Sequence, residues 1–217
     1  MIPRGKDNDA KDRILDTAEA LFAQNGYYAV SVRQITTDAE CNLAAVNYHF
    51  GNKKNLYLEV FRSRWVPRAQ RLHESFIGNL AGQDISSLRD ILHALAKAFI
   101  EGPLTDDERA RHHQLITREL AKPIGALEIV AAEIQRPLFK ELGDLLNQFL
   151  PEEQDRQDLT LKLLSMFSML QFFNFAREWV AFITDREYDQ AFKDNLIEHI
   201  TDFCSLGIGE KETGDGK

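Results

Sequence analysis

The chain has 217 residues, a formal net charge of −8 and 44% hydrophobic residues, which is enough for a sizeable core in one large domain or two small ones. No apolar run is as long as a membrane span, and the N-terminus lacks the apolar segment of a signal peptide. We therefore expect a cytoplasmic protein with no membrane partner. Cys41 and Cys204 match no zinc or redox spacing, so we expect no cofactor or metal site and two half-buried thiols.

The first residues predict an arm followed by a helix. Residues 1–8 are polar, contain Pro3 and Gly5, and are typical of a flexible arm. A helix is predicted over about residues 9–24, because apolar residues recur at helical spacing and Gly26 follows as a stop signal. Its inward stripe consists of Ile14, Leu15, Ala18, Leu21 and Phe22.

Residues 31–54 predict two short helices, a tight corner and the start of a third helix. Ser31 can cap the first helix through its hydroxyl group. Asn42 can cap the second, which we expect to begin at Leu43 and to end at Gly51. The residues expected to face inward are Val32, Ile35, Ala39, Val46 and Phe50.

The opposite face of the second helix is small, aromatic and amide-bearing, which is unusual for a solvated helix. It carries Leu43, Ala44, Asn47 and Tyr48. Such a face suits a helix that enters a DNA groove, because small side chains allow close approach and an asparagine can pair with an adenine edge. Tyr48, His49 and Lys53 can donate to phosphates. The pattern predicts a helix-turn-helix whose second helix reads the major groove.

These residues also resemble a known family. The resemblance is carried by Phe22, Asn25-Gly26-Tyr27, Ser31-Val32-Arg33-Gln34-Ile35, Val46-Asn47-Tyr48-His49-Phe50-Gly51-Asn52-Lys53 and Leu56. The pattern is similar to the DNA-binding domain of the TetR family of transcriptional repressors over about residues 10–61. The chain departs from the family at Glu40, where glycine is usual in the turn, and at Asn47, where tyrosine is frequent. The predicted DNA-binding residues are Arg33, Thr36, Asn42, Leu43, Ala44, Ala45, Asn47, Tyr48, His49 and Lys53.

Charge alone does not favour a DNA partner. Residues 1–60 carry seven basic side chains against eight acidic ones, so the basic groups must be sorted onto one face for this interpretation to hold. The basic residues are Arg4, Lys6, Lys11, Arg13, Arg33, Lys53 and Lys54. If the family geometry holds, most of them lie beside DNA, although Arg4 and Lys6 can equally be scattered surface charge.

Six helices are predicted after the helix-turn-helix, and the first four of them extend to about residue 150. The first starts near Asn52 and contains Pro67, which should bend or break it and marks either a hinge or a local kink. The next three cover about residues 86–101, 106–121 and 126–150, and the last of these three is expected to kink near Pro137.

The last two helices predict a second copy of the chain as a partner. A helix over about residues 153–183 is apolar nearly all round, and a helix over about 188–206 has one apolar stripe. One domain core cannot easily cover the first of these, and the resemblance implies that both pair with their twins in a four-helix homodimer interface. The predicted interface residues are Phe167, Leu170, Phe173, Phe192, Leu196, Ile200 and Phe203. Residues 207–217 are expected to be a disordered tail.

No catalytic constellation is visible, and the adjacent His112 and His113 point to different helix faces. Polar residues within the apolar segments either satisfy one another or line the dimer seam, or they anchor a small molecule against aromatic walls. The candidates for ligand binding are Arg118, Glu119, Gln171, Asn174, Phe175, Arg177 and Trp179. The segment from Arg118 to Pro123 also resembles, more weakly, one branch of the TetR family.

We therefore predict an all-α regulator that is not an enzyme, with a three-helix helix-turn-helix domain at residues 1–54 and a larger helical ligand-binding and dimerisation domain at 55–206. Its expected partners are double-stranded DNA with a palindromic operator, a second copy of the chain, and an unknown small-molecule inducer. The alternatives are a DNA-binding activator or architectural protein without a ligand and, with less support, an all-α enzyme or carrier.

Overall fold

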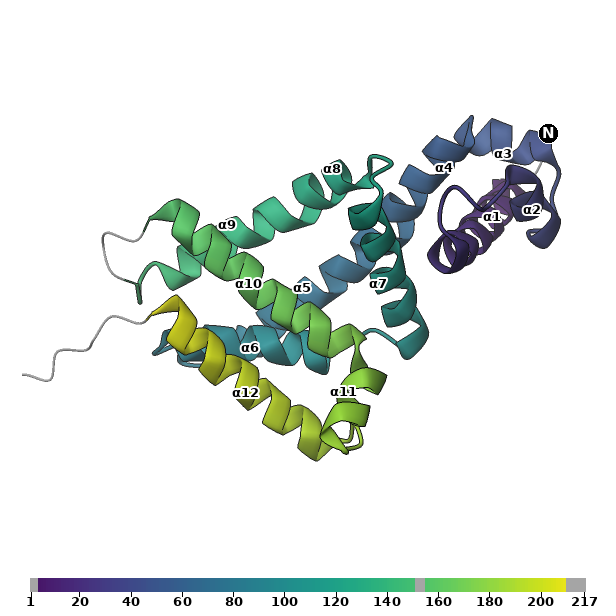
Figure 1. The fold of residues 1–217 in the computed structure, drawn as a ribbon. Coiled ribbons are helices and arrows are strands. Elements are labelled where there is room, and N and C mark those ends of the chain that lie inside the picture. The colour runs from purple at the N-terminus through teal and green to yellow at the C-terminus, as the bar shows by residue number, and fades with distance from the viewer. Residues whose placement is uncertain (1–3, 151–154, 210–217) are drawn as a thin grey trace, which may run out of the picture. The chain divides into compact units, whose positions relative to one another are not determined.

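The computed structural model describes residues 4–150 and 155–209, and this part of the chain is helical with no strand, as predicted (Figure 1). Contacts divide the chain into two compact units. Unit 1 comprises Met1–Gln70 and Leu104–Gln135, and unit 2 comprises Arg71–Pro103 and Arg136–Lys217. The predicted start at residues 151–153 of a later helix and residues 210–217 of the predicted tail lie outside the described residues.

Unit 1 contains the predicted helix-turn-helix and two later helices. Its elements are α1 (Arg4–Asn25), α2 (Val32–Asp38), α3 (Leu43–Phe50), α4 (Lys53–Val60), the π-helical turn η1 (Phe61–Trp65), the start of α5 (Val66–Leu80), α7 (Asp106–Ala121), α8 (Ala126–Val130) and the π-helical turn η2 (Ala131–Gln135). Helix α1 begins at Arg4, so the prediction of a flexible arm is wrong for residues 4–8. Proline is tolerated at the start of a helix, so Pro3 does not prevent this extension.

The core of unit 1 explains why α7 and α8 belong to it. Phe22 of α1 and Val46 of α3 are fully buried, and the same hydrophobic cluster includes Leu115 of α7 and Ala126 of α8. A helix-turn-helix of this size has little core of its own, so burial of these extra side chains adds hydrophobic stabilisation. The functional boundary placed at residue 54 stays a prediction, whereas the compact unit that contains the helix-turn-helix is larger.

Both predicted proline kinks take the form of π-helical turns. Turn η1 ends two residues before Pro67 and η2 ends two residues before Pro137. Proline cannot donate to the carbonyl four residues earlier, and a π-helical turn is a common way for a helix to absorb such a defect. At Pro67 that carbonyl is Ser63 O, which accepts a hydrogen bond from Arg64 Nη1 at 3.1 Å. The helix therefore continues through Pro67 and is not broken.

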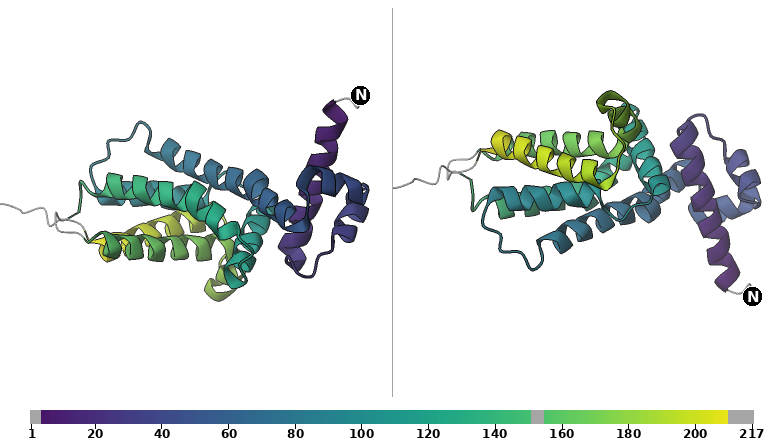
Figure 2. Two further views of the ribbon diagram at one scale, coloured as in Figure 1. Left: turned by 90° about the horizontal axis from the view of Figure 1, so that it is seen from above. Right: turned by 90° about the horizontal axis from the view of Figure 1, so that it is seen from below.

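Unit 2 is a layered arrangement of helices. It contains the rest of α5 together with α6 (Leu88–Ile100), α9 (Arg136–Leu146), α10 (Arg156–Phe175), α11 (Arg177–Thr184) and α12 (Gln190–Ile208). Helix α6 packs along α12, and α10 contacts both (Figure 2). Ser87 starts α6 with a capping box, in which the Asp90 backbone N–H donates to Ser87 Oγ and the Ser87 backbone N–H donates to the Asp90 carboxylate.

The prediction of one helix over residues 153–183 is wrong. The chain breaks at Ala176 into α10 and α11, whose axes are bent by 81°. No glycine or proline marks this break. Instead, Arg177 Nη2 donates to the carbonyl oxygen of Ile100 at 2.8 Å and to Asn174 Oδ1 at 3.3 Å, which holds the first turn of α11 against the end of α6.

Within the described part of the chain, no single helix combines the length and apolar character needed to cross a membrane. Helices α10 and α11 reach that length and composition only as a pair, across their 81° bend.

Candidate nucleic-acid interface

Side-chain caps fix the three short helices of the interface. Ser31 Oγ accepts a hydrogen bond from the Gln34 backbone N–H at 3.1 Å, and Asn42 Oδ1 accepts one from the Ala45 N–H at 2.9 Å. Asn52 Oδ1 does the same for the next helix at 2.9 Å. Each cap satisfies one of the backbone donors that a helix start leaves unpaired. The predicted starts of α2 and α3 and the predicted end of α3 at Gly51 are confirmed.

Helix α3 presents the predicted face to solvent. Val46 and Phe50 are buried in the core, whereas Leu43 is 54% exposed and Tyr48 is 77% exposed. Ala44 and Asn47 are also exposed, and Ala45 and His49 are half-buried at the edges of the face. Leu43 and Tyr48 thus lie on a short, uncharged helical surface that is open to solvent.

Two predicted DNA-binding residues of this region have defined roles within the chain. Thr36 is 6% exposed and its hydroxyl donates to the Arg33 carbonyl at 2.9 Å, so the structure does not place Thr36 on the exposed face. Asn42 is exposed, but its side-chain oxygen is used as the cap of α3. The Arg33 side chain is exposed.

The turn between α2 and α3 contains Glu40, at which the sequence departs from the glycine usual in the TetR family. Glu40 has a φ of 51°, which is the left-handed region that glycine adopts without steric cost. The turn therefore keeps the geometry of a glycine turn, and the glutamate side chain is held there under strain.

Lys53 opens α4, as predicted, and lies over an aromatic ring. Its Nζ is 4.2 Å from the centroid of the Tyr27 ring. Burial lowers the pKa of Lys53 from its ordinary value. The cation–π contact orients the ammonium group at the N-terminus of α4, where backbone N–H groups also favour an anion.

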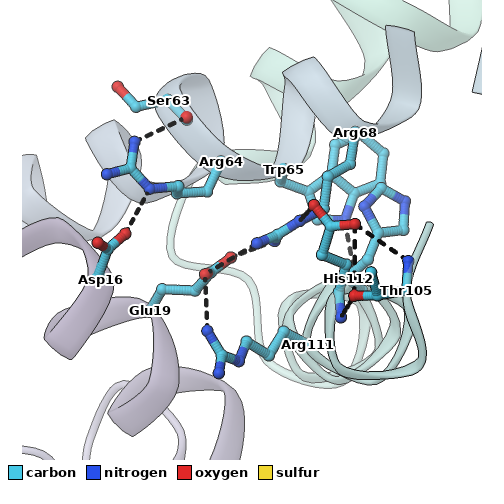
Figure 3. A network of polar contacts seen from close by, with 10 residues as sticks. Asp16, Glu19, Ser63, Arg64, Trp65, Arg68, Thr105, Arg111 and His112 are labelled. Carbon is cyan, nitrogen blue, oxygen red and sulfur yellow. Dashed lines mark hydrogen bonds and ion pairs between the residues drawn. The ribbon is translucent and has the colours of Figure 1, made fainter. Parts of the chain in front are cut away.

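Basic side chains of unit 1 that face α1 pair with carboxylates, whereas two stretches of the helix-turn-helix, separated by the exposed Asp38 and Glu40, carry no acid. On α1 and its neighbours, Arg64 pairs with Asp12 at 3.1 Å. Arg64 also pairs with Asp16 at 2.8 Å, and Arg68 pairs with Glu19 (Figure 3). By contrast, residues 20–37 and 41–58 contain no acidic side chain. Within the described ranges, the basic side chains of these two stretches form no ion pair with a carboxylate; they are Arg33, Lys53 and Lys54.

A buried polar network connects α1 to the start of α5 and to α7 (Figure 3). Glu19 is 1% exposed, accepts from both terminal nitrogens of Arg68, and lies 3.7 Å from Arg111 Nη1. Next to it, Trp65 Nε1 donates to the His112 carbonyl at 3.0 Å, and the two rings stack with centroids 4.2 Å apart. Burial, with smaller effects of Arg68 and His113, lowers the pKa of His112 to about 3, so this ring is neutral. The network fixes the helices that hold α3 in place.

Arg118 and Glu119, predicted as ligand anchors, are engaged within unit 1. Arg118 donates to the carbonyl oxygens of Ala23 and Gln24 at the end of α1. Glu119 is fully buried: Oε2 accepts from the Tyr57 hydroxyl at 2.9 Å, and Oε1 accepts from the backbone N–H groups of residues 124–127 at 2.7–3.4 Å. These contacts join α1, α4, α7 and α8, and the sequence gives no local signal for them.

The other predicted ligand residues lie in unit 2. Asn174 is fully buried and bonded to Arg177, whose guanidinium also lies 5.0 Å from the Tyr188 ring centroid. Gln171 and Phe175 are half-buried, and Trp179 is 57% exposed and stacks on Phe182. Asn174 and Arg177 are thus bonded to each other, whereas the prediction that these residues line a pocket is not tested. A role for any of them in ligand binding stays a prediction.

The predicted dimer residues divide into two groups. Leu170, Leu196 and Ile200 are at most 5% exposed within one protomer, so they cannot form a surface for a partner in this conformation. Phe167 and Phe192 contact other rings of unit 2, Phe173 lies near His199, and Phe203 is 59% exposed.

The prediction missed a set of exposed apolar side chains on α10 and α12. Its members are Leu161, Leu164, Phe172 and Leu206. Leu161, Leu164 and Phe172 follow helical spacing along one side of α10, opposite the buried Leu163, Met166 and Leu170. A helix that is apolar all round can be recognised from sequence, but which side faces the protomer core cannot.

Two family profiles match the chain. Residues 14–60 match the profile described as bacterial regulatory proteins, tetR family. Residues 88–208 match the profile described as the C-terminal domain of the HTH-type transcriptional dual regulator CecR.

Full-length relatives agree with these matches. The HTH-type transcriptional dual regulator CecR of Shigella flexneri is 24% identical over 220 residues, covering 95% of this chain and 96% of that protein. The HTH-type transcriptional repressor NicS of Pseudomonas putida is 23% identical over 201 residues, covering 91% and 92%. Among solved structures, the multidrug binding protein EbrR complexed with imidazole has a TM-score of 0.60 and 19% identity, covering 98% of this chain and 97% of that one. This last likeness concerns the fold alone.

Proposed function

The chain belongs to the tetR family of bacterial regulatory proteins, and on that premise we propose that it is a repressor which a small-molecule inducer releases from a palindromic operator. Members of the family are DNA-binding transcriptional regulators that act as dimers, and they are not enzymes. Beyond the family, we propose that this chain represses transcription, binds a palindromic operator, responds to an inducer and lies in the cytoplasm.

The exposed face of α3 carries the proposal. Leu43 and Tyr48 are more than half exposed on a helix without charged side chains, flanked by acid-free segments of the chain. In the proposed complex Asn47 reads a base edge in the major groove, and Leu43 and Ala44 allow the helix backbone to approach. Lys53 and Arg33 contact phosphates on either side and set the register.

A homodimer would present two copies of α3. We propose that the partner covers the exposed apolar residues of α10 and α12, chiefly Leu161, Leu164, Phe172, Phe203 and Leu206. Leu161 and Phe203 line one groove of about 270 Å³ between the two helices, which can receive side chains from the second copy. Two recognition helices related by a two-fold axis fit half-sites whose centres are about 34–36 Å apart, or a multiple of that distance.

The inducer is proposed to bind in unit 2. A cavity of about 460 Å³ between α9 and α10 is lined by apolar and polar side chains, among them Phe139, Asn147 and Leu163. Its volume falls in the range typical of small-molecule sites. An inducer can shift the protein away from DNA only by its difference in affinity between the two states.

A second candidate function is activation at some promoters. It is favoured by one observation, namely that the CecR relative is called a dual regulator. Activation and repression use the same α3 face, so they differ in the position of the operator relative to the promoter and not in the interface.

The test compares a phosphate contact with a base contact. Binding to the duplex upstream of the protein's own gene is measured as a function of salt for the wild type and for Lys53→Ala, Asn47→Ala and the exposed control Lys97→Ala. We expect Lys53→Ala to weaken binding to all duplexes and to reduce the salt slope by about 0.9. Asn47→Ala should keep the slope and relax the preference at one base pair of each half-site.

The proposal is contradicted if neither substitution changes its expected quantity. If Lys53→Ala binds with the wild-type slope and Asn47→Ala keeps the wild-type base preference, α3 and α4 do not face DNA. Lys97→Ala removes one positive charge on α6 of unit 2 and should change neither quantity.

A further inference from the structure

A basic residue from the end of α7 lies beside the proposed DNA-binding surface. Lys122 is the C-cap of α7, and its Nζ is 3.9 Å from the centroid of the Tyr28 ring. Tyr28 packs edge to face on Tyr27 with centroids 5.3 Å apart, and Tyr27 is the ring over which Lys53 lies. Ammonium groups from α4 and from the end of α7 are therefore held on adjacent rings of one loop.

Two further contacts bring the same segments together. A Cβ placed on Gly125 would lie 3.9 Å from Lys54 Nζ, so Lys54 runs beside the loop that follows α7. Arg118 Nη1 would lie 3.2 Å from a Cβ on Gly26, because its guanidinium covers the loop that follows α1. Gly26 has a φ of 79°, so glycine is needed there on backbone grounds as well. The turn after α7 is thus part of the same surface as the start of α4.

The surface forms a shallow basic depression without acidic side chains. A hollow of about 280 Å³ is lined by residues 25–29, Tyr57, Arg118 and Lys122, among others. The single acid in residues 117–127 is Glu119, which is fully buried and engaged with backbone N–H groups. Across the described segments, Lys54, Arg118 and Lys122 make no ion pair with a carboxylate, in contrast to the basic residues facing α1.

We propose that the end of α7 is part of the DNA interface, and that Lys122 contacts the phosphodiester backbone next to the contact made by Lys53. This proposal rests on the proposed function. An acidic protein that keeps one set of lysines away from carboxylates leaves them able to neutralise phosphates. The Tyr28 ring orients the Lys122 side chain before binding, which lowers the entropy lost when the contact forms. Tyr28 is 62% exposed, and its hydroxyl is a second donor for the same backbone.

The open shape of the depression favours a duplex over a small anion. A small ligand needs enclosure, whereas here one wall is the largely exposed Tyr28. A DNA strand needs only several donors that can reach its phosphates, and Lys53, Lys54 and Lys122 supply three at the start of α4 and the end of α7.

The experiment measures the salt dependence of duplex binding by the full-length protein. Lys122→Ala should reduce the slope of log K against log salt by about 0.9, equally for the operator and for an unrelated duplex. Lys122→Glu should reduce it further, and Lys122→Arg should retain the wild-type slope. Lys97→Ala is the matched control, because it removes the same charge from unit 2 and should leave the slope unchanged.

The outcomes separate this inference from the function on which it rests. A wild-type slope for Lys122→Ala together with a reduced slope for Lys53→Ala would overturn the role of α7 and leave the proposed function standing. Equal reductions for Lys122→Ala and Lys97→Ala would also overturn it, because net charge alone would then explain the effect. Unchanged slopes for Lys53→Ala and Lys122→Ala would overturn both proposals.

Discussion

The buried carboxylate of Glu119 should hold the turn after α7 in place. Replacing Glu119 by alanine removes the acceptor for four backbone N–H groups, at residues 124–127, and for the Tyr57 hydroxyl. Burial and the neighbouring carboxylate raise the pKa of Tyr57, so the phenol stays protonated and donates. The three-residue loop between Lys122 and Ala126 offers no other cap for the start of α8, since Gly125 has no side chain.

The expected cost is large for one side chain. Hydrogen bonds to a charged group contribute about 1.5–3 kcal/mol each, and buried donors left without an acceptor add to the loss. The bonds of Glu119 share one carboxylate and are not additive, so we expect Glu119→Ala to cost about 4 kcal/mol and Tyr57→Phe about 2 kcal/mol. Glu119→Gln keeps one acceptor oxygen without the charge and should fall between these values.

Hydrogen exchange is the appropriate assay, because a chain with two compact units need not unfold in one step. In Glu119→Ala the amides of residues 124–127 should exchange at least about 30-fold faster, which corresponds to about 2 kcal/mol of local opening free energy. The control is Glu128→Ala, which removes an exposed carboxylate from the first turn of α8. Unchanged exchange at residues 124–127 in Glu119→Ala would refute the assigned role.

Three further predictions concern strain, pH and assembly. Glu40→Gly should stabilise the protein by up to about 1 kcal/mol in urea unfolding, because relief of the left-handed strain at φ 51° exceeds the added entropy of the unfolded chain, whereas Glu40→Gln should not. His112 has a pKa of about 3 when folded and about 6.5 when unfolded, so only the unfolded state gains a proton between these values. The contribution of His112 to the free energy of unfolding is therefore complete above pH 6.5, and about 2 kcal/mol of it is lost by pH 5. The thermal unfolding temperature of His112→Phe should depend less on pH over that range than the wild-type temperature does. Phe203→Asp should shift sedimentation from dimer to monomer with unchanged helix content, and a tight dimer would contradict the interface on α10 and α12.

The helix-turn-helix could be predicted from sequence because its signals are local. Ser31 and Asn42 cap the two helices through contacts that span three residues, and Gly51 ends α3 with a φ of 76°. The division of α3 into a buried and an exposed face follows from helical period alone. For that reason the exposure of Leu43 and Tyr48 agrees with the prediction.

The roles of polar residues in the later helices could not be predicted, because their partners are distant in sequence. Arg118 is bonded to carbonyl groups at the end of α1, and Glu119 to Tyr57 on α4. The break at Ala176 has no glycine or proline and depends on the contact of Arg177 with Ile100. Thr36 was placed on the wrong side because a short helix of seven residues has few positions from which to judge its inward face.

The most direct test of the central claim is methylation protection of guanine N7 in a duplex bound by the wild-type protein. Guanine N7 lies in the major groove, so the α3 face should protect guanines in two half-sites on one side of the duplex. Asn47→Ala should retain this pattern with an altered base preference. A protein that binds the duplex at low salt and protects no guanine N7 would contradict the account.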